Sequence, residues 1–288
     1  MDIRVGSRES KLAVVQSEMV IDAIKSYDEN INVDLITMKT TGDIILDKTL
    51  DKIGGKGLFV KELDKALASG QVDITVHSLK DMPAEIPEEL PILAYSKRED
   101  PRDVMILPEG VKEIDYSKPI GCASLRRKLY LEKIFPEATF APIRGNVQTR
   151  LKKLDEGQYS AIILAYAGIK RLGLEARVSR VFSVEEVLPA ACQGILAVQG
   201  RAGDKAEYLS AFASEEGRIV AETERAFIKA LDGGCSAPTA AYCIIDNDEV
   251  SISGFFVRDD GTEIRDSIRG PIAGHEELAV KLALSMKG

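Results

Sequence analysis

The chain has 288 residues, 45% hydrophobic and 29% charged, which is enough to bury the cores of two or three domains. A formal charge of -8 argues against a nucleic-acid partner, because such proteins usually present a net basic face. Four cysteines without a CxxC pair and only two histidines argue against a metal site and a disulfide framework. No apolar run approaches the roughly 18 residues of a membrane span. The charged start MDIRVGSRESK has no secretory pattern, so we expect a cytoplasmic protein without membrane contact.

The first part of the chain alternates strand and helix patterns. Strands are predicted at residues 3–7, 33–39 and 71–79. Helical spacing of apolar side chains follows the first strand, behind Ser10 as a possible N-cap, and recurs in FVKELDKALASG, which stops at Gly70. Strands separated by helices predict a mostly parallel sheet with helices on its faces.

A second lobe is predicted after SKREDPRD, residues 96–103, because this charged, proline-containing segment suits a crossing between lobes. Helices are expected at 125–135 and 147–154, and strands in IGCAS, TFAPIR and SAIILAY; the apolar run 161–169, which overlaps SAIILAY, is interpreted as a buried strand. LPAACQGILAVQGR, residues 188–201, returns to a strand pattern whose partner we expect in the first lobe. Two lobes connected twice in this way can hinge.

The C-terminal part of the sequence has a different pattern of predicted elements. A helical pattern from Glu215 precedes two glycines, and two hairpins with Asp-Asn-Asp and Asp-Asp-Gly turns lead to a helix at about 276–286. The predicted fold is therefore α/β, with two doubly wound lobes and a small C-terminal α+β domain that has an antiparallel sheet. The predicted domains are residues 1–95 with 194–213, residues 100–191, and residues 216–288.

Basic residues recur where predicted strands meet helices, the edge at which parallel α/β sheets bind ligands: Arg8, Lys56, Lys80, Arg126, Arg127, Arg144 and Arg150. In SLRRK, two arginines occupy the first turn of a helix behind Ser124, where the helix already carries partial positive charge. A bound anion would resolve this conflict. For any single arginine, a solvated surface charge is the better explanation, but the repetition favours binding of several carboxylates or phosphates.

HSLKDMP, residues 77–83, places Lys80 and Asp81 at the carboxyl end of a predicted strand. A lone aspartate in a turn more often bonds to the backbone than acts in catalysis. Beside so many cations, however, Asp81 is the best acid-base candidate, because its carboxylate could stabilise a positive charge that develops on a substrate. His77 is expected to be packed or hydrogen-bonded rather than catalytic.

Cys235 lies in DGGCSAP, a tight loop in which a thiol can be exposed. Cys122 and Cys243 fall in apolar strand patterns and are expected to be buried, and the environment of Cys192 is left open. No His-Asp pattern marks Cys235 as a protease nucleophile. Its residues alone leave two interpretations, an inconsequential loop thiol and an attachment point for a thioether.

The chain resembles the porphobilinogen deaminases, also called hydroxymethylbilane synthases, from Arg4 through the C-terminal domain. The resemblance is carried by motifs in the family's order: TGDIILD, GGKGLFVKEL, HSLKDMP, REDPRD, SLRR, IRGNVQTRL and DGGCSAP. It implies two lobes similar to periplasmic binding proteins, joined by two hinge crossings around an active-site cleft, and a small third domain. It also implies a transferase of porphyrin and haem biosynthesis. Such an enzyme deaminates four porphobilinogens, joins them head to tail on a dipyrromethane primer, and releases hydroxymethylbilane by hydrolysis.

The same resemblance assigns roles to residues. Cys235 would hold the dipyrromethane cofactor through a thioether, and Asp81 would hold pyrrole nitrogens and stabilise an azafulvene-type cation. The acetate and propionate groups would be bound by basic residues, namely Arg8, Lys80, Arg126, Arg127, Arg144, Arg150 and Arg171. Further expected site residues are Ser10 and Ser124 at hydrogen-bonding positions, and Lys56 and Phe59 in a mobile loop, roughly residues 40–57, that would cover the cleft. Gln193 would lie near the cleft.

Two positions depart from the commoner family pattern. Cys122 stands where threonine is usual, which would cost a cofactor hydrogen bond, and Cys192 stands where glycine is usual. Two extra thiols near the cleft would make an enzyme sensitive to oxidation. The rival hypotheses are a non-catalytic two-lobe protein that binds an anionic solute, and an acyl- or phosphoryl-transfer enzyme with Cys235 as nucleophile. The second rival lacks a positioned base and a Walker-type loop. We take a monomer as the expected state.

Overall fold

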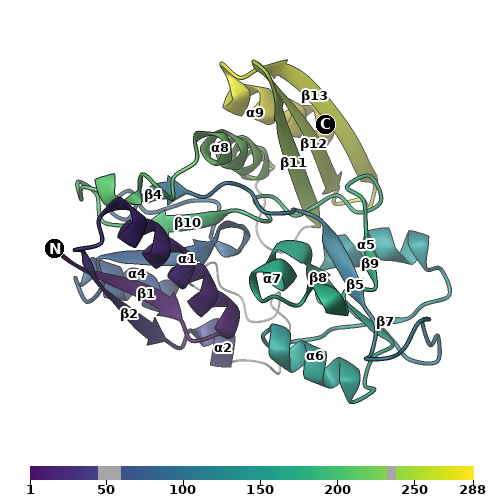
Figure 1. Ribbon diagram of the computed structural model, residues 1–288. Helices are drawn as coiled ribbons and strands as arrows, with labels where there is room; N and C mark the ends of the chain where they lie inside the picture. The colour runs from purple at the N-terminus through teal and green to yellow at the C-terminus, as the bar shows by residue number, and fades with distance from the viewer. Residues whose placement is uncertain (45–59, 232–237) are drawn as a thin grey trace.

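The computed structural model describes residues 1–44, 60–231 and 238–288 and contains three sheets. Two have five strands, in the orders β2-β1-β3-β10-β4 and β7-β6-β8-β5-β9, and the third has the order β11-β12-β13. Figure 1 shows the first lobe on the left, the second on the lower right and the C-terminal sheet above them. The predicted fold class, two α/β lobes with a small antiparallel domain, is confirmed.

The first lobe is built mainly from the N-terminal part of the chain. Its helices are α1 (Lys11–Tyr27), α2 (Thr41–Ile44) and α4 (Lys61–Ala68), and its strands are β1 (Asp2–Arg8), β2 (Asn32–Met38), β3 (Ile74–Ser78), β4 (Ile92–Tyr95) and β10 (Leu196–Gln199). Strand β1 runs parallel to β2 and β3, whereas β10 is antiparallel to β3 and β4. The predicted return of the chain to the first lobe is confirmed by β10. Ser10 caps α1, as predicted, because its hydroxyl accepts a hydrogen bond from Ala13 N.

The second lobe repeats this arrangement. Its strands are β5 (Asp103–Ile106), β6 (Ile120–Gly121), β7 (Phe140–Ala141), β8 (Ala161–Ala165) and β9 (Arg180–Val181), and its helices are α5 (Leu125–Ile134), α6 (Val147–Asp155) and α7 (Tyr166–Arg171). Strand β8 confirms the strand predicted in SAIILAY, whereas the interpretation of the whole run 161–169 as one buried strand is wrong. The last ladder pair of β8 joins Ala165 to Asp103, where β5 begins, and the backbone N–H of Tyr166 still donates to Arg102 O at 2.9 Å. From there the chain continues as the helix α7 and not as a strand.

The chain crosses between the lobes twice, once between β4 and β5 and once between β9 and β10. The two crossings touch, because Glu99 N donates a hydrogen bond to Gly194 O at 3.1 Å. Gly194 has a φ of 94°, and a side chain there would collide with the backbone oxygen of Glu99. Glycine therefore permits both the left-handed backbone and the close approach.

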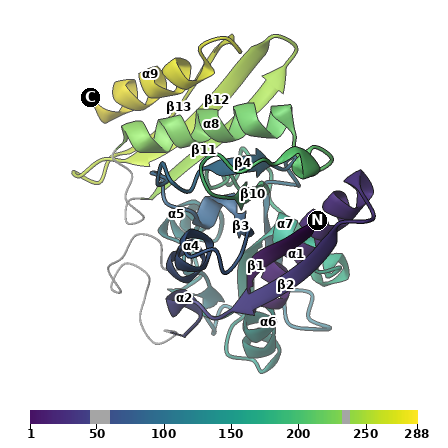
Figure 2. The ribbon, with the colours of Figure 1, turned by 90° about the vertical axis from the view of Figure 1, so that its left-hand side faces the viewer.

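The C-terminal part consists of α8 (Glu215–Ala230), β11 (Thr239–Asp246), β12 (Glu249–Val257), β13 (Glu263–Pro271) and α9 (His275–Lys287). Both predicted hairpins are present, since β12 pairs antiparallel with β11 and β13. Helix α8 lies between this sheet and the first lobe (Figure 2), and Phe255 of β12 contacts Tyr130 of α5. The small domain thus packs on both lobes, while the exact domain boundaries stay a prediction. Across residues 1–44, 60–231 and 238–288, no helix is both long and apolar enough to cross a membrane.

Candidate active site

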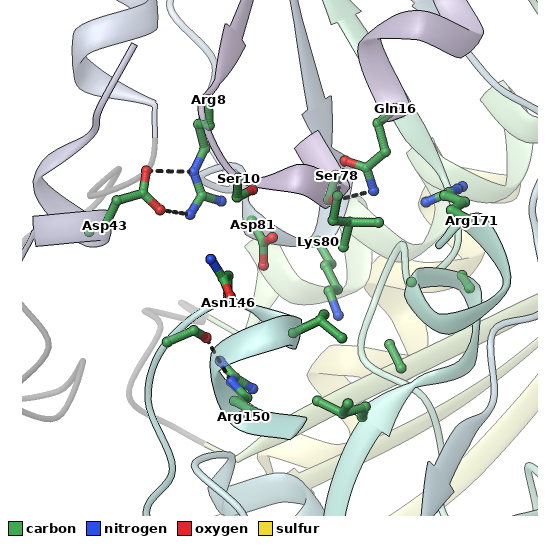
Figure 3. Close-up of a pocket in the computed structure, with 18 of the residues that line it drawn as sticks. Arg8, Ser10, Gln16, Asp43, Ser78, Lys80, Asp81, Asn146, Arg150 and Arg171 are labelled. Atoms are coloured by element: carbon green, nitrogen blue, oxygen red, sulfur yellow. Dashed lines mark hydrogen bonds and ion pairs between the residues drawn. The ribbon is translucent and has the colours of Figure 1, made fainter. Parts of the chain in front are cut away.

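A cavity of about 460 Å³ lies between the two lobes. This is an ordinary size for a small-molecule site, roughly 300–1,000 Å³. Figure 3 shows Arg8, Ser10, Lys80 and Asp81 on one side of it and Arg150 on the other. The cavity brings together these predicted residues with Arg127, Arg144, Arg171 and Gln193.

The sheets explain why these side chains meet. Strand β1 ends at Arg8, and β3 runs into a 3₁₀ turn, Leu79–Asp81, that contains Lys80 and Asp81. In the second lobe β8 leads into α7, which ends at Arg171. The carboxyl ends of strands from both lobes therefore face one cleft, which is where α/β sheets bind ligands.

Lys80 and Asp81 are both exposed to the cavity. Lys80 Nζ donates a hydrogen bond to Gln193 Oε1 at 3.3 Å. Partial desolvation in the cleft lowers the pKa of Lys80 to about 8; the charge of Arg127 acts in the same direction and Asp81 opposes it. Lys80 therefore titrates closer to neutrality than an ordinary lysine.

The two arginines at the start of α5 point in different directions. Arg127 lines the cavity, whereas Arg126 donates to Asp103 and to Leu188 O behind it. Ser124 is likewise absent from the cavity lining and caps α5, since its hydroxyl accepts a hydrogen bond from Arg127 N. The adjacent positions 126 and 127 differ by about 100° around the helix, so only one of them faces the cleft.

Asp103 is a residue that the sequence analysis did not single out. It is fully buried and forms ion pairs with Arg126 at 2.8 Å and Arg127 at 2.7 Å. Burial alone would raise the pKa of Asp103, but the charges of the two arginines overcome this effect and hold the pKa far below its usual range. The feature of the sequence that could have identified Asp103 is its position at the end of the motif REDPRD.

Arg150 and Arg171 are half-buried, and each donates a hydrogen bond to a backbone oxygen rather than to a carboxylate. Arg150 Nε donates to Gly145 O at 2.8 Å, and Arg171 Nη2 donates to Gly194 O at 2.6 Å. Desolvation lowers the pKa of Arg171 to about 10, and that of Arg150 to about 10 together with repulsion from Arg127. A bound anion would relieve this unfavourable concentration of positive charge.

Arg8 is engaged by a carboxylate of the chain itself. Its Nε donates to Asp43 Oδ2 at 3.1 Å and its Nη2 pairs with Asp43 Oδ1, as Figure 3 shows. Thr40 also donates to Asp43 through its hydroxyl, at 2.7 Å. Burial tends to raise the pKa of Asp43, but these donors lower it below its usual value. Asp43 was not predicted, and a substrate carboxylate that used the same edge of Arg8 would have to displace it.

His77 is packed within the first lobe, as predicted. It is buried, its Nε2 lies 2.9 Å from Thr75 Oγ1, and desolvation lowers its pKa to about 4. The ring is therefore neutral at physiological pH. It does not line the cavity.

Three predicted residues, Cys235, Lys56 and Phe59, lie outside the described residues, as does most of the loop at 40–57. The other cysteines, Cys122, Cys192 and Cys243, are buried, as expected for Cys122 and Cys243. Burial raises the pKa of all three thiols, that of Cys243 to about 12. Since the thiolate is the reactive form, the structure does not favour the expected sensitivity of Cys122 and Cys192 to oxidation.

Comparisons with known proteins bear directly on this cleft. Residues 3–208 match the porphobilinogen deaminase dipyrromethane cofactor-binding domain, and residues 219–288 match the porphobilinogen deaminase C-terminal domain. The porphobilinogen deaminase of Acetivibrio thermocellus is 59% identical over 286 residues, covering 99% of this chain and 98% of that protein. That of Alkaliphilus oremlandii is 59% identical over 288 residues, covering 100% of this chain and 97% of that protein.

Among solved structures, the methionine-binding protein MetQ aligns with a TM-score of 0.47 and 13% identity, covering 77% of this chain and 94% of that one. The sequence matches are far stronger than this structural match, and the two family models together cover residues 3–208 and 219–288. The chain therefore belongs to the porphobilinogen deaminase family, the transferases that polymerise porphobilinogen on a dipyrromethane cofactor in tetrapyrrole biosynthesis.

Proposed function

We propose that the cavity between the lobes is the active site of this hydroxymethylbilane synthase. There it deaminates four porphobilinogen molecules, joins them head to tail on a dipyrromethane primer and releases hydroxymethylbilane by hydrolysis. The observation that carries the proposal is the cavity lining itself. In a chain of formal charge -8, Asp81 faces a cleft lined by lysine and arginine side chains from both lobes.

The donor set fits a dipyrromethane. Each pyrrole ring carries an acetate and a propionate, and the proposed partners of these groups are Arg8, Lys80, Arg127, Arg144, Arg150 and Arg171. Within the described residues, the buried Nε atoms of Arg127 and Arg171 have no hydrogen-bond partner. A carboxylate at each position would accept hydrogen bonds from these donors and would raise the pKa of Arg171 back towards its usual value.

Asp81 is the proposed catalytic residue. Its carboxylate would accept hydrogen bonds from pyrrole N–H groups and stabilise the positive charge that develops on the substrate as ammonia leaves. Lys80, its neighbour in the 3₁₀ turn, would bind a substrate carboxylate and so orient the ring. One turn of the first lobe thus supplies both orientation and electrostatic stabilisation.

Cys235 is the proposed attachment point of the primer, through a thioether. The three cysteines that the structure describes are buried and have raised pKa values, which supports the remaining one as the reactive thiol. Cys235 would hold the primer, which when bound would supply the pyrrole carbon that accepts the first substrate molecule.

The other expected residues take supporting parts in the proposal. Ser10 and Gln193 line the cavity and are proposed to bind the oligopyrrole, whereas Arg126 and Ser124 would act through Asp103 and the start of α5. Lys56 and Phe59, which lie outside the described residues, are proposed to contact the growing oligopyrrole. The proposal also includes that the protein is a cytoplasmic monomer. It includes no nucleic-acid partner, which the formal charge of -8 supports.

Intact mass spectrometry of the purified protein tests this function. The wild-type mass should exceed the sequence mass by one dipyrromethane, and Cys235→Ala should show the bare sequence mass and no turnover. Cys243→Ala, which removes a buried thiol, is the matched control and should keep the added mass. A folded wild-type protein at the bare mass that stays inactive after incubation with porphobilinogen would overturn the proposal. Reversible binding of an anionic solute without added mass would favour the two-lobe binding protein instead.

A further inference from the structure

Asp103 opens β5 and is fully buried although it is charged. One carboxylate oxygen accepts a hydrogen bond from Arg126 Nη2 and the other accepts one from Arg127 Nη2. Gln193 Nε2 donates to the second of these oxygens at 2.9 Å. A single buried anion therefore contacts two neighbouring cations of α5 and the second crossing between the lobes.

The hydrogen bonds fix the orientation of the Gln193 amide. Its Oε1 accepts from Lys80 Nζ at 3.3 Å and from Arg127 Nη2 at 3.4 Å, and both of these groups can only donate. Its Nε2 donates to Asp103 and, at 2.6 Å, to Pro101 O, and both of these can only accept. A rotated amide would place donor against donor and acceptor against acceptor. Gln193 thus links Lys80 of the first lobe to Arg127 and Asp103 of the second.

The charges explain why this link needs an anion. Arg126 and Arg127 lie side by side in the first turn of α5, where the helix already carries partial positive charge, and both are buried. Two uncompensated guanidinium groups there would repel each other strongly in the low-dielectric interior. Asp103 neutralises one of the two charges and accepts a hydrogen bond from each group.

We propose that Asp103 is a positioning residue for carboxylate binding. It holds Arg127 at the cavity wall and, through Gln193, sets the position of Lys80 on the opposite lobe. Asp103 does not line the cavity, so it acts through these side chains and does not touch the substrate. The inference rests on the proposed function, because it assigns to Asp103 a part in the same cleft.

The test compares the full chain with Asp103→Asn, Gln193→Met and Asp155→Asn. Asp155 is a matched control, since it also holds an arginine of the second lobe, Arg177 at 2.7 Å, but lies outside the cavity. Each variant is measured for thermal unfolding, intact mass, and kcat and KM for porphobilinogen across a range of pH. Intact mass reports cofactor assembly without depending on turnover by the loaded enzyme.

We expect Asp103→Asn to assemble less cofactor and, in the loaded fraction, to raise KM about tenfold or more, as expected when charged hydrogen-bond donors lose their place. The change in kcat should stay below about threefold. The pH dependence of KM should also shift. Lys80 faces Asp81 of its own turn, Arg126 and Arg127 of α5, and Asp103 of β5, and Asp103 is one of the two charges that raise its pKa. The rise in KM as Lys80 loses its proton should therefore begin at lower pH in Asp103→Asn.

Folded Asp103→Asn with wild-type cofactor content, KM and pH profile overturns the inference, as does a loss of kcat alone. If Asp103→Asn does not fold, Gln193→Met decides, measured alone and together with Lys80→Met, because it keeps the ion pairs of Asp103 and removes the amide. Gln193 also lines the cavity, and the loss of a direct contact with the substrate would raise KM equally in both backgrounds. A severalfold higher KM that disappears when Lys80 is replaced supports the proposal, and a wild-type KM or an equal rise in both backgrounds overturns it. Asp155→Asn should match the wild type throughout. Absence of the cofactor mass from the wild type overturns the proposed function and, with it, the inference.

Discussion

Arg98 and Glu224 form an ion pair inside the protein, with Arg98 Nη2 at 2.7 Å from Glu224 Oε2. Arg98 lies on the first crossing between the lobes, and Glu224 is a fully buried residue of α8. The same carboxylate accepts hydrogen bonds from Cys192 N at 2.5 Å and from Cys243 N at 2.6 Å. One side chain of the small domain therefore holds both crossings and the first strand of the C-terminal sheet.

Replacing Glu224 by glutamine should lower the free energy of unfolding by about 3–5 kcal/mol, because Arg98 would remain buried without its counter-charge. Chemical denaturation measures this change. Glu215→Gln, at an exposed ion pair with Arg218 on the same helix, is the control and should cost less than about 1 kcal/mol. Equal effects of the two substitutions would contradict the role assigned to the buried pair.

Asp81→Asn should leave a folded, cofactor-loaded protein whose kcat falls on the order of 100-fold or more, because the amide cannot stabilise a positive charge on the substrate as a carboxylate does. Intact mass shows whether the cofactor is loaded, and steady-state kinetics measure kcat. Asp22→Asn, on the outer part of α1, should retain full activity. A wild-type kcat from Asp81→Asn would remove it from the catalytic role.

The pKa of Lys80, lowered to about 8, predicts a pH dependence of substrate binding. Lys80 is charged below this pKa and becomes neutral above it, so KM for porphobilinogen should rise between about pH 7 and 9. Lys80→Arg keeps its charge over this range and should show a flatter profile, whatever its KM at neutral pH. The same rise in both proteins would mean that another group titrates.

Cys192 has a φ of 62°, in the left-handed region that favours glycine. Cys192→Gly should therefore be more stable than Cys192→Ala, by about 1 kcal/mol, although glycine normally weakens a folded chain relative to alanine. The same two substitutions at Cys243, within β11, are the control and should show the ordinary order. Urea unfolding of the four variants gives the comparison, and alanine more stable than glycine at both positions would contradict it.

Much of the fold follows from local patterns in the sequence. The N-cap at Ser10, the hairpins of the C-terminal sheet and the return of β10 to the first lobe were predicted from helical spacing, turn residues and an apolar run. Strands β4 and β5 were missed, because each has only four residues and they flank a charged segment with a proline. Short strands owe their conformation to their neighbours in the sheet, and those neighbours are distant in the sequence.

The site was harder to predict than the fold. Clustering of cations at strand ends followed from sheet geometry, but the sequence could not distinguish Arg127 at the cavity from Arg126 behind it. Asp43 and Asp103 were not identified, because their roles depend on arginines that are distant in the sequence. Arg8 lies 35 residues from Asp43, and Arg126 lies 23 residues from Asp103. Pairwise electrostatic contacts of this kind depend on packing, which a linear pattern does not contain.

Among the described residues, the charged ones that line the cavity are seven cations and three anions, although the whole chain carries a formal charge of -8. The rest of the molecule therefore repels small anions, while the cleft concentrates an attractive field between low-dielectric walls. The consequence is kinetic: a dicarboxylate monomer that diffuses towards the protein is guided to the cleft. Its association rate should fall with ionic strength, since salt screens this guidance over roughly 10 Å at 0.1 M.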